Sequence, residues 1–187
     1  MAREAGAEVA WAPRRGYGSA CLAAMALVPD ADILVFLDGD GSDVPEELPA
    51  LLAALEDQRA DVVIGSRVLG DAEPGALTPL QHFGNRLTCS LVRWLWGVRY
   101  TDLGPYRAVT REALSQLDMA DPDFGWTIEM QVKAAQRGLR VVEIPVSYRV
   151  RQAGRSKVSG TLWGSYHAGR RILGYVAEAK LAELRER

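Results

Sequence analysis

Two aspartates, Asp38 and Asp40, follow directly after the apolar stretch 33–37 and are separated by a single glycine. Alternate residues of a strand point to the same side, so both carboxylates can face one spot at the carboxyl end of a strand, where α/β sheets bind ligands. Their repulsion would be relieved by a cation, and carboxylate oxygens suit Mg²⁺ or Mn²⁺ held together with substrate phosphates. This DXD pattern therefore predicts a site for a metal and a phosphorylated ligand. The alternative is an ordinary surface turn, in which Asp and Gly are common.

Two basic groups could hold the phosphates of such a ligand. Gly16 and Gly18 belong to a glycine-rich turn that follows two arginines, ahead of a predicted helix whose N-terminal amides would favour an anion. An ordinary loop is the alternative for this turn. Arg67 directly follows the predicted strand 61–66, at the same sheet edge as the two aspartates, and its planar fork can pair with a carboxylate or a diphosphate.

A third basic group lies toward the C-terminus, where residues 149–157 carry four positive charges and a hydroxyl. Gly154 allows a tight turn, and Ser156 beside Lys157 offers a donor and a cation for phosphate oxygens. Together with Arg151, these residues predict a mobile lid over a diphosphate. The alternative is a solvated basic loop.

Two further acidic residues have more than one interpretation. Asp102, in the turn before a short predicted strand, could act as a general base or orient Arg107. Glu129, early in a predicted helix, could face the site or be an ordinary first-turn acid. His82 and His167 have no ligand partner at metal-binding spacing and are interpreted as structural or exposed.

Alternating strands and helices must position these residues. The pattern predicts an α/β fold with a mostly parallel sheet and helices on both faces. Nucleotide-binding α/β domains normally open with a strand, whereas this sequence begins in a predicted helix, so we expect the first strand-helix-strand unit to be missing. Ser19 and Asp43 are predicted to cap the helices that follow them. The predicted strands are 8–11, 33–37, 61–66, one within 104–109, and 139–150, and the predicted helices are 20–27, 45–58, 80–96, 111–117, 126–137 and a final one after 160.

Composition narrows the class of protein. The 187 residues, 48% of them apolar, predict one domain at 1–160 and a C-terminal amphipathic helix at 161–187. A net charge of −2 gives no overall field for nucleic acid. Cys21 and Cys89 lack CxxC spacing, which predicts reduced thiols in a cytoplasmic protein without a disulfide or zinc. No apolar run is long enough to span a membrane; the tryptophans of helix 80–96 indicate packing, or a peripheral membrane contact if they are exposed.

In combination, these residues resemble the dolichyl-phosphate mannose synthase-like branch of the inverting family 2 glycosyltransferases. Each motif is weak alone, but their order and approximate spacing agree over nearly the whole chain. The resemblance implies a GT-A fold, a nucleotide-sugar donor bound through Mg²⁺ or Mn²⁺, and transfer of the sugar with inversion to a polyprenyl phosphate or similar acceptor. The motifs are RGYG at 15–18, LDGD at 37–40, GSR at 65–67, Asn85 with Arg86, Thr101 with Asp102, Gly104, Tyr106 with Arg107, Glu129, and Tyr148 with Arg151, Gly154, Ser156 and Lys157.

The resemblance also implies roles for individual residues. Asp38 would contact the nucleotide and Asp40 the metal, and Ser42 stands where relatives often carry glutamine or histidine. Arg67 would lie beside the diphosphate or sugar. Arg86 and Ser90 would lie near the acceptor phosphate. Arg151 and Lys157 would belong to a loop that closes over the phosphates.

The implied chemistry depends on the acceptor. A phosphate, with a second pKa of about 6, is largely ionised near neutral pH and needs no strong base. A sugar hydroxyl would need a carboxylate such as Asp102 or Glu129 to take its proton. Two alternatives are a non-catalytic nucleotide-diphosphate-binding module, favoured by the missing first unit, and a nucleotidyltransferase, which would release pyrophosphate. No nucleic-acid partner is expected, whereas peripheral contact at the inner face of the membrane and a homo-oligomer are both compatible with the sequence.

Overall fold

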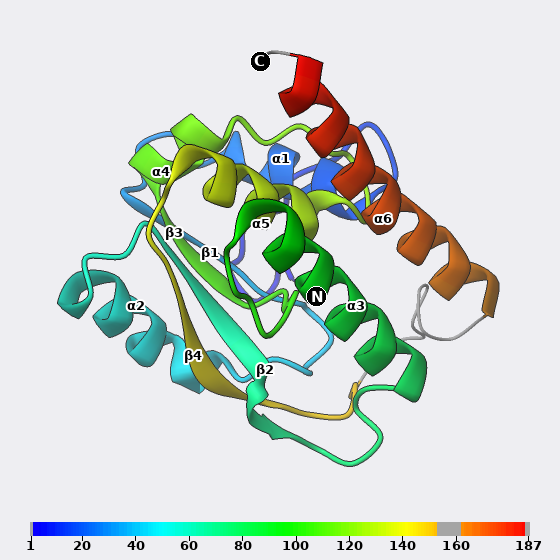
Figure 1. Cartoon of the computed structure of the whole chain (residues 1–187). Coiled ribbons are helices and arrows are strands. Elements are labelled where there is room, and N and C mark those ends of the chain that lie inside the picture. Colours follow the sequence, from blue (N-terminus) through cyan, green and yellow to red (C-terminus); the bar gives the residue numbers. More distant parts are fainter. Residues whose placement is uncertain (1, 153–161, 186–187) are drawn as a thin grey trace.

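A four-stranded sheet forms the centre of the protein (Figure 1). The computed structural model describes residues 2–152 and 162–185, with the side chains of 162–166 left out. The order of strands is β1-β3-β2-β4; β3 is antiparallel to both of its neighbours, and β2 is parallel to β4. Three strands therefore run in one direction and β3 runs against them. The strands are β1 (Ile33–Phe36), β2 (Val62–Ala72), β3 (Arg107–Thr110) and β4 (Val141–Tyr148).

Helices cover both faces of the sheet. Helix α2 lies on one face, and the remaining α-helices of the described residues lie on the other (Figure 1). Side chains alternate across a strand, and accordingly Val63 faces the α2 side while Val62 and Ile64 belong to the larger core on the opposite side. The helices are α1 (Tyr17–Met25), α2 (Leu48–Asp57, after the 3₁₀ turn Pro45–Glu47), α3 (Pro79–Trp96), α4 (Arg111–Leu117), α5 (Trp126–Arg137) and α6 (Leu162–Arg185).

The register of the sheet decides which loops meet. Phe36, Arg107, Ile64 and Glu143 form one row across the four strands. The end of β1 and the beginning of β3 therefore lie together, beside Ile64 in the first part of β2. The acidic loop after β1, the residues after Ile64 and the turn before β3 are brought together there.

The structure confirms the α/β class with helices on both faces and corrects several local predictions. Residues 8–11 form no strand; they are largely exposed and have no core face to hold one. Ser19 lies inside α1, which begins after Gly16. Asp43 does not cap the following helix, because its carboxylate accepts a hydrogen bond from the backbone of Asp38. Arg67 lies within β2 instead of after it, because pairing with β4 resumes beyond an irregularity between Ser66 and Asp71.

The tryptophans of α3 differ in their surroundings. The indole of Trp96 donates to Glu183 at 2.8 Å and lies under Lys180, so this side chain joins α3 to α6. Trp94 is 79% exposed. Only one of the two tryptophans is therefore free for contact with another surface.

Candidate active site

The loop after β1 is closed by hydrogen bonds to its own carboxylates. Asp38 donates its backbone N–H to Asp43 (2.7 Å), and Ser42 donates its backbone N–H to Asp40 (2.9 Å). Burial raises the pKa of Asp38, and the negative charge of Asp40 raises it further. The carboxylates of Asp38 and Asp40 are thus close enough to repel each other, as their spacing predicts. The other oxygen of Asp43, Oδ1, is buried and has no partner among the described residues.

The beginning of the basic segment 149–157 lies against this loop. The guanidinium of Arg151 is 2.6 Å from Oδ2 of Asp40. The backbone N–H of Arg149 donates to the backbone carbonyl of Ser42, and the backbone N–H of Gln152 donates to the backbone carbonyl of Asp40. The structure therefore brings the first residues of the predicted lid to the paired aspartates. Ser156 and Lys157 lie outside the described residues, and their predicted role stays a prediction.

Arg67 connects the acidic loop to the turn before β3. Its guanidinium forms two hydrogen bonds with Asp102, at 2.7 and 2.8 Å, and its backbone N–H donates a third at 2.9 Å. The guanidinium also stacks over the ring of Tyr148 at 5.0 Å. Its positive charge lowers the pKa of both Asp38 and Asp43. Arg67 therefore lies between the paired aspartates and Asp102.

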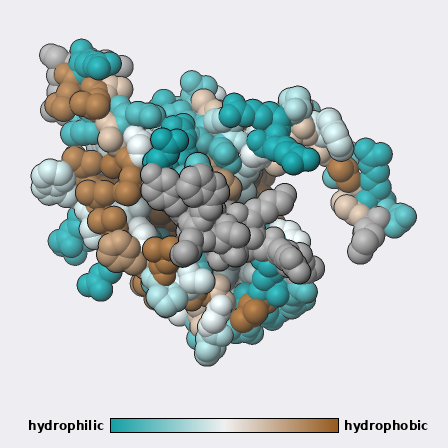
Figure 2. All heavy atoms as spheres, turned by 90° about the vertical axis from the view of Figure 1, so that its right-hand side faces the viewer, coloured by the Kyte–Doolittle hydropathy of each residue, from teal (hydrophilic) through white to brown (hydrophobic). Residues whose placement is uncertain are grey.

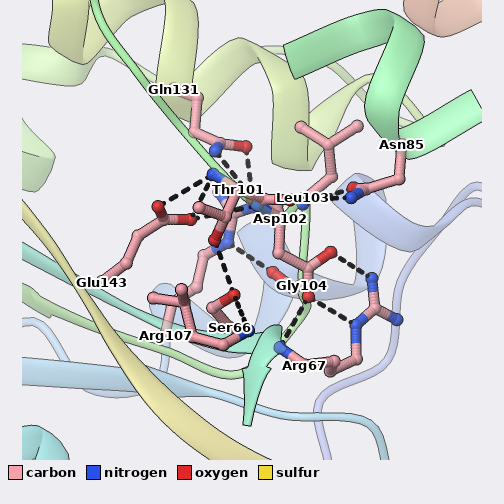
Figure 3. A network of polar contacts seen from close by, with 11 residues as sticks. Ser66, Arg67, Asn85, Thr101, Asp102, Leu103, Gly104, Arg107, Gln131 and Glu143 are labelled. Atoms are coloured by element: carbon pink, nitrogen blue, oxygen red, sulfur yellow. Dashed lines mark hydrogen bonds and ion pairs between the residues drawn. The ribbon is translucent and has the colours of Figure 1, made fainter. Parts of the chain in front are cut away.

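Four side chains from different elements hold the turn that carries Asp102 (Figure 3). Glu143 on β4 accepts the backbone N–H groups of Thr101 and Asp102 at 2.8–3.0 Å. Gln131 on α5 donates to the carbonyl of Asp102. The side-chain amide of Asn85 on α3 donates to the carbonyl of Thr101 and accepts the N–H of Leu103. The hydroxyl of Ser66 on β2 is hydrogen-bonded to the hydroxyl of Thr101. Since each bond is made by a packed element, the position of Asp102 is fixed.

Asp102 therefore orients Arg67. The prediction that it orients Arg107 is wrong, because the two side chains form no hydrogen bond or ion pair. The buried guanidinium of Arg107 donates to the carbonyls of Gly104 and Thr127 and to the side chain of Gln131. Glu143 and Gln131 were not predicted to matter. An acid inside an apolar extended segment, as Glu143 is, was the available signal.

A cleft of about 320 Å³ opens between α3 and α6 beside this pair. Arg67 and Asp102 are among the residues that line it, and the rest of its wall is mainly apolar. The apolar lining comes chiefly from Leu77, Leu80, Phe83, Leu87, Leu103, Ile172 and Leu173. The arrangement suits a ligand with a charged end near Arg67 and an apolar remainder.

Other predicted site residues lie elsewhere. Arg86 and Ser90 are on the exposed side of α3, where the hydroxyl of Ser90 donates to the carbonyl of Arg86. Glu129 is buried, accepts the backbone N–H groups of residues 120 and 121, and pairs with Lys133 at 2.7 Å. Its carboxylate thus holds the turn before α5, which is the structural alternative. His82 and His167 are both exposed.

Close backbone contacts give the glycine-rich turn a packing reason. A Cβ at Gly16 would lie 2.1 Å from the carbonyl oxygen of Pro122, and one at Gly18 would lie 1.9 Å from that of Asp121. The N–H of Ser19 donates to the same Pro122 oxygen. An anion-binding role for Gly16 and Gly18 stays a prediction.

Asp38 and Asp40 are the residues that fit a divalent metal. No group of three or more His, Cys, Asp or Glu side chains in the described part of the chain is arranged to hold a metal ion. Two carboxylates nevertheless suit Mg²⁺ or Mn²⁺ when substrate phosphates complete the coordination. The repulsion that raises the pKa of Asp38 is the conflict that a cation would relieve.

The stability of the metal-free protein is expected to depend on Asp43 between pH 4 and pH 6. Burial raises the pKa of this carboxyl from 3.8 to about 6. The folded state then binds more protons than the unfolded state, so stability falls as the pH rises through this window. Thermal unfolding in a chelator should show a smaller fall for Asp43→Asn. Asp38 and Glu143, whose pKa values are also raised, are unchanged in that variant, and equal slopes for the two proteins would contradict the prediction.

Comparisons with known proteins give consistent matches. The family described as "Glycosyl transferase family 2" matches residues 1–118. An uncharacterised glycosyltransferase of Mycobacterium tuberculosis is 39% identical over 171 residues, which are 88% of this chain and 74% of that protein. Polyprenol monophosphomannose synthase of Mycolicibacterium smegmatis is 36% identical over 160 residues, which are 81% of this chain and 53% of that protein.

The fold also matches solved structures. Glucosyl-3-phosphoglycerate synthase of Mycobacterium tuberculosis, in complex with Mn²⁺, UDP-glucose and phosphoglyceric acid, has a TM-score of 0.67 at 21% identity. The match covers 94% of this chain and 57% of that structure, so the chain spans little more than half of that protein's length. Within the described residues, no helix is long and apolar enough to cross a membrane.

Proposed function

Because the chain belongs to glycosyltransferase family 2, we propose that it moves a sugar from a nucleoside-diphosphate sugar to a polyprenyl phosphate or similar phosphate acceptor, with inversion. Its fold is the GT-A fold. The observation that carries the proposal is the meeting of Asp38 and Asp40 with Arg67 and Arg151 at one sheet edge, beside an apolar cleft. The name of the Mycolicibacterium smegmatis relative, polyprenol monophosphomannose synthase, supports the choice of acceptor.

The donor diphosphate is assigned to the acidic loop. Asp38 and Asp40 would hold Mg²⁺ or Mn²⁺, whose charge would stabilise the departing diphosphate. The Mn²⁺ and UDP-glucose bound to the structurally similar synthase support this choice. The side chain of Arg151 is 36% exposed at Asp40, so it can turn from the carboxylate to phosphate oxygens. Lys157 and Ser156 are assigned to the same phosphates on the strength of their shared motif.

The acceptor is assigned to the cleft between α3 and α6. Arg67 lines the cleft and offers a positive charge to a phosphate, while the apolar wall suits a hydrocarbon chain. The motif also assigns Arg86 and Ser90 to the acceptor phosphate, but neither residue lines the cleft, so this role stays a prediction. A phosphate oxygen would attack the anomeric carbon as the bond from that carbon to the nucleoside diphosphate breaks.

The engagement of Asp102 favours a phosphate acceptor over a hydroxyl. Both of its carboxylate oxygens are bound by Arg67, and the carboxylate is 1% exposed. Such a group is poorly suited to take a proton from substrate. A phosphate acceptor needs no proton to be removed, so we assign Asp102 as a positioning residue for Arg67.

The test is turnover of nucleotide sugars by the purified protein with Mn²⁺ and a polyprenyl phosphate. The expected products are a nucleoside diphosphate and a glycosylated polyprenyl phosphate whose anomeric configuration, read by NMR, is inverted. Release of pyrophosphate would instead indicate a nucleotidyltransferase. Metal-dependent nucleotide binding without turnover would indicate a binding module.

Replacing Arg151 by alanine is expected to lower turnover about 10²-fold or more, because a cation is lost where charge develops on the leaving group. The melting temperature should change little, since a partly exposed ion pair contributes at most about 1 kcal/mol. Arg149→Ala is the matched control, because Arg149 is an exposed cation of the same segment. Equal losses of turnover in both variants would show that only the net charge of the segment matters.

A further inference from the structure

Helix α3 exposes large apolar side chains along one stripe. Leu80, Phe83, Leu87 and Trp94 are 50%, 65%, 36% and 79% exposed. At about 100° per residue, these four positions fall within about 60° of the helix circumference. A soluble protein seldom leaves so many large apolar residues together on one exposed helix face.

The charged residues of α3 itself are both arginines. Arg86 and Arg93 are exposed and lie next to the stripe on the same side of it, and the 18 residues of α3 contain no other arginine or lysine. No aspartate or glutamate occurs in the helix. An apolar stripe flanked by basic residues is the pattern of helices that lie in the interface of an anionic membrane.

Three residues of the stripe also line the cleft. Leu80, Phe83 and Leu87 line the cleft from α3, and Leu173, 37% exposed, lines it from α6. In Figure 2 the side carrying α6 faces the viewer, and apolar side chains gather at the left of the view, where α3 comes to lie. The apolar surface is therefore continuous with the opening that leads to Arg67.

We propose that this surface, the α3 face, binds an anionic lipid bilayer peripherally, so that the cleft opens among lipid headgroups. The α3 face consists of Leu80, Phe83, Arg86, Leu87, Arg93 and Trp94. The inference goes beyond the proposed transfer reaction by naming the surface on which it would occur. A chain-anchored acceptor could then enter the cleft without leaving its bilayer.

Charge favours a bilayer over a second copy of the chain. In a two-fold dimer through this face, the same patch would meet itself. The arginines would then face arginines with no acid on the helix to pair with them, and like charges disfavour such an interface. Anionic headgroups supply the missing negative charge.

The test is sedimentation of the protein with vesicles, without nucleotide sugar, acceptor or metal. Vesicles of phosphatidylcholine containing about one quarter phosphatidylglycerol should bind the protein, and pure phosphatidylcholine vesicles should bind it at least about fivefold more weakly. Phe83→Ser/Trp94→Ser should lower binding to the anionic vesicles about tenfold or more. Arg93→Gln should lower it about fivefold, since one surface cation contributes about that factor, and should not change binding to the neutral vesicles.

A matched control keeps the test specific. Trp11→Ser/Leu181→Ser removes a tryptophan and another large apolar side chain that are 89% and 54% exposed but lie outside the α3 face. This variant should bind like the original protein, and circular dichroism should show that all variants are folded. Brominated lipids should quench part of the tryptophan fluorescence, and Trp94→Phe should remove that part.

Three results would overturn the inference. They are binding that does not depend on anionic lipid, equal losses in the control and the α3-face variants, and a dimer that Phe83→Ser/Trp94→Ser dissociates. The vesicle assay contains neither donor nor acceptor, so it is independent of the turnover assay. Vesicle binding together with no turnover in the separate assay would contradict the proposed transfer reaction but not the proposed membrane surface. Turnover of a soluble short-chain acceptor without vesicle binding would do the reverse.

Discussion

Asp40→Ala is expected to lower the rate of sugar transfer at least about 10³-fold and to abolish its dependence on Mn²⁺. The substitution removes one of two carboxylates assigned to the metal, and preorganised charge at a leaving group commonly accounts for rate factors of this size. It also removes the partner of Arg151. Initial rates measured over a range of Mn²⁺ concentrations check the prediction.

The fold should survive this substitution. Asp40 contributes one hydrogen bond to the backbone of Ser42 and one ion pair to a partly exposed arginine, which together are worth on the order of 1–2 kcal/mol. Glu46→Ala is the matched control, because it removes an exposed acid a few residues away. Metal-dependent turnover by Asp40→Ala at an undiminished rate would refute the metal assignment.

Asp102→Ala should have the largest effect on stability, a loss of about 3–5 kcal/mol in the free energy of unfolding. The side chains of Arg67 and Asp102 are only 12% and 1% exposed, and removing one partner of a buried ion pair leaves an uncompensated charge. Denaturant unfolding measures the loss. An unchanged midpoint would show that solvent or another group compensates Arg67.

A double variant that removes both charges tests the buried ion pair as one unit. Arg67→Met/Asp102→Leu removes both charges and should recover much of the stability that Asp102→Ala loses, because apolar replacement of a whole buried pair is often neutral. It should not recover turnover, since the cation that lines the cleft is gone.

The pH–rate profile of Asp102→Ala separates positioning from base catalysis. If Asp102 were a general base, the acidic limb of the profile would disappear in this variant. If Asp102 only positions Arg67, the acidic limb should remain.

Local sequence patterns were sufficient to predict that Asp38, Asp40 and Arg67 would meet at one sheet edge. An apolar strand followed by two acids predicts that these acids lie at the carboxyl end of the strand. The next strand of the same direction brings Arg67 to the same edge of the sheet. Helices α3 and α5 were predictable from periodicity and from Gly138, whose left-handed conformation ends α5. These features depend on neighbours within a few residues.

The turn that carries Asp102 depends on contacts between distant segments and could not be predicted in the same way. Asp102 meets Arg67 across 35 residues of sequence, and Glu143 meets Asp102 across 41. Which acid serves which cation is decided by the insertion of β3 between β1 and β2, which alternation alone does not reveal. For the same reason the glycine-rich turn gave no sign that Pro122 and Asp121 would lie against it.

The reversed direction of β3 places the proposed donor and acceptor sites on different pieces of the chain. The paired aspartates follow β1, whereas the turn that carries Asp102 precedes β3 and is held by side chains from β2, α3, α5 and β4. Under the proposed function, changes in α3 or α6 would therefore alter the hydrocarbon recognised while the loop of Asp38 and Asp40 keeps its shape. Descendants of such a scaffold could diversify what they glycosylate long before they change the sugar nucleotide they consume.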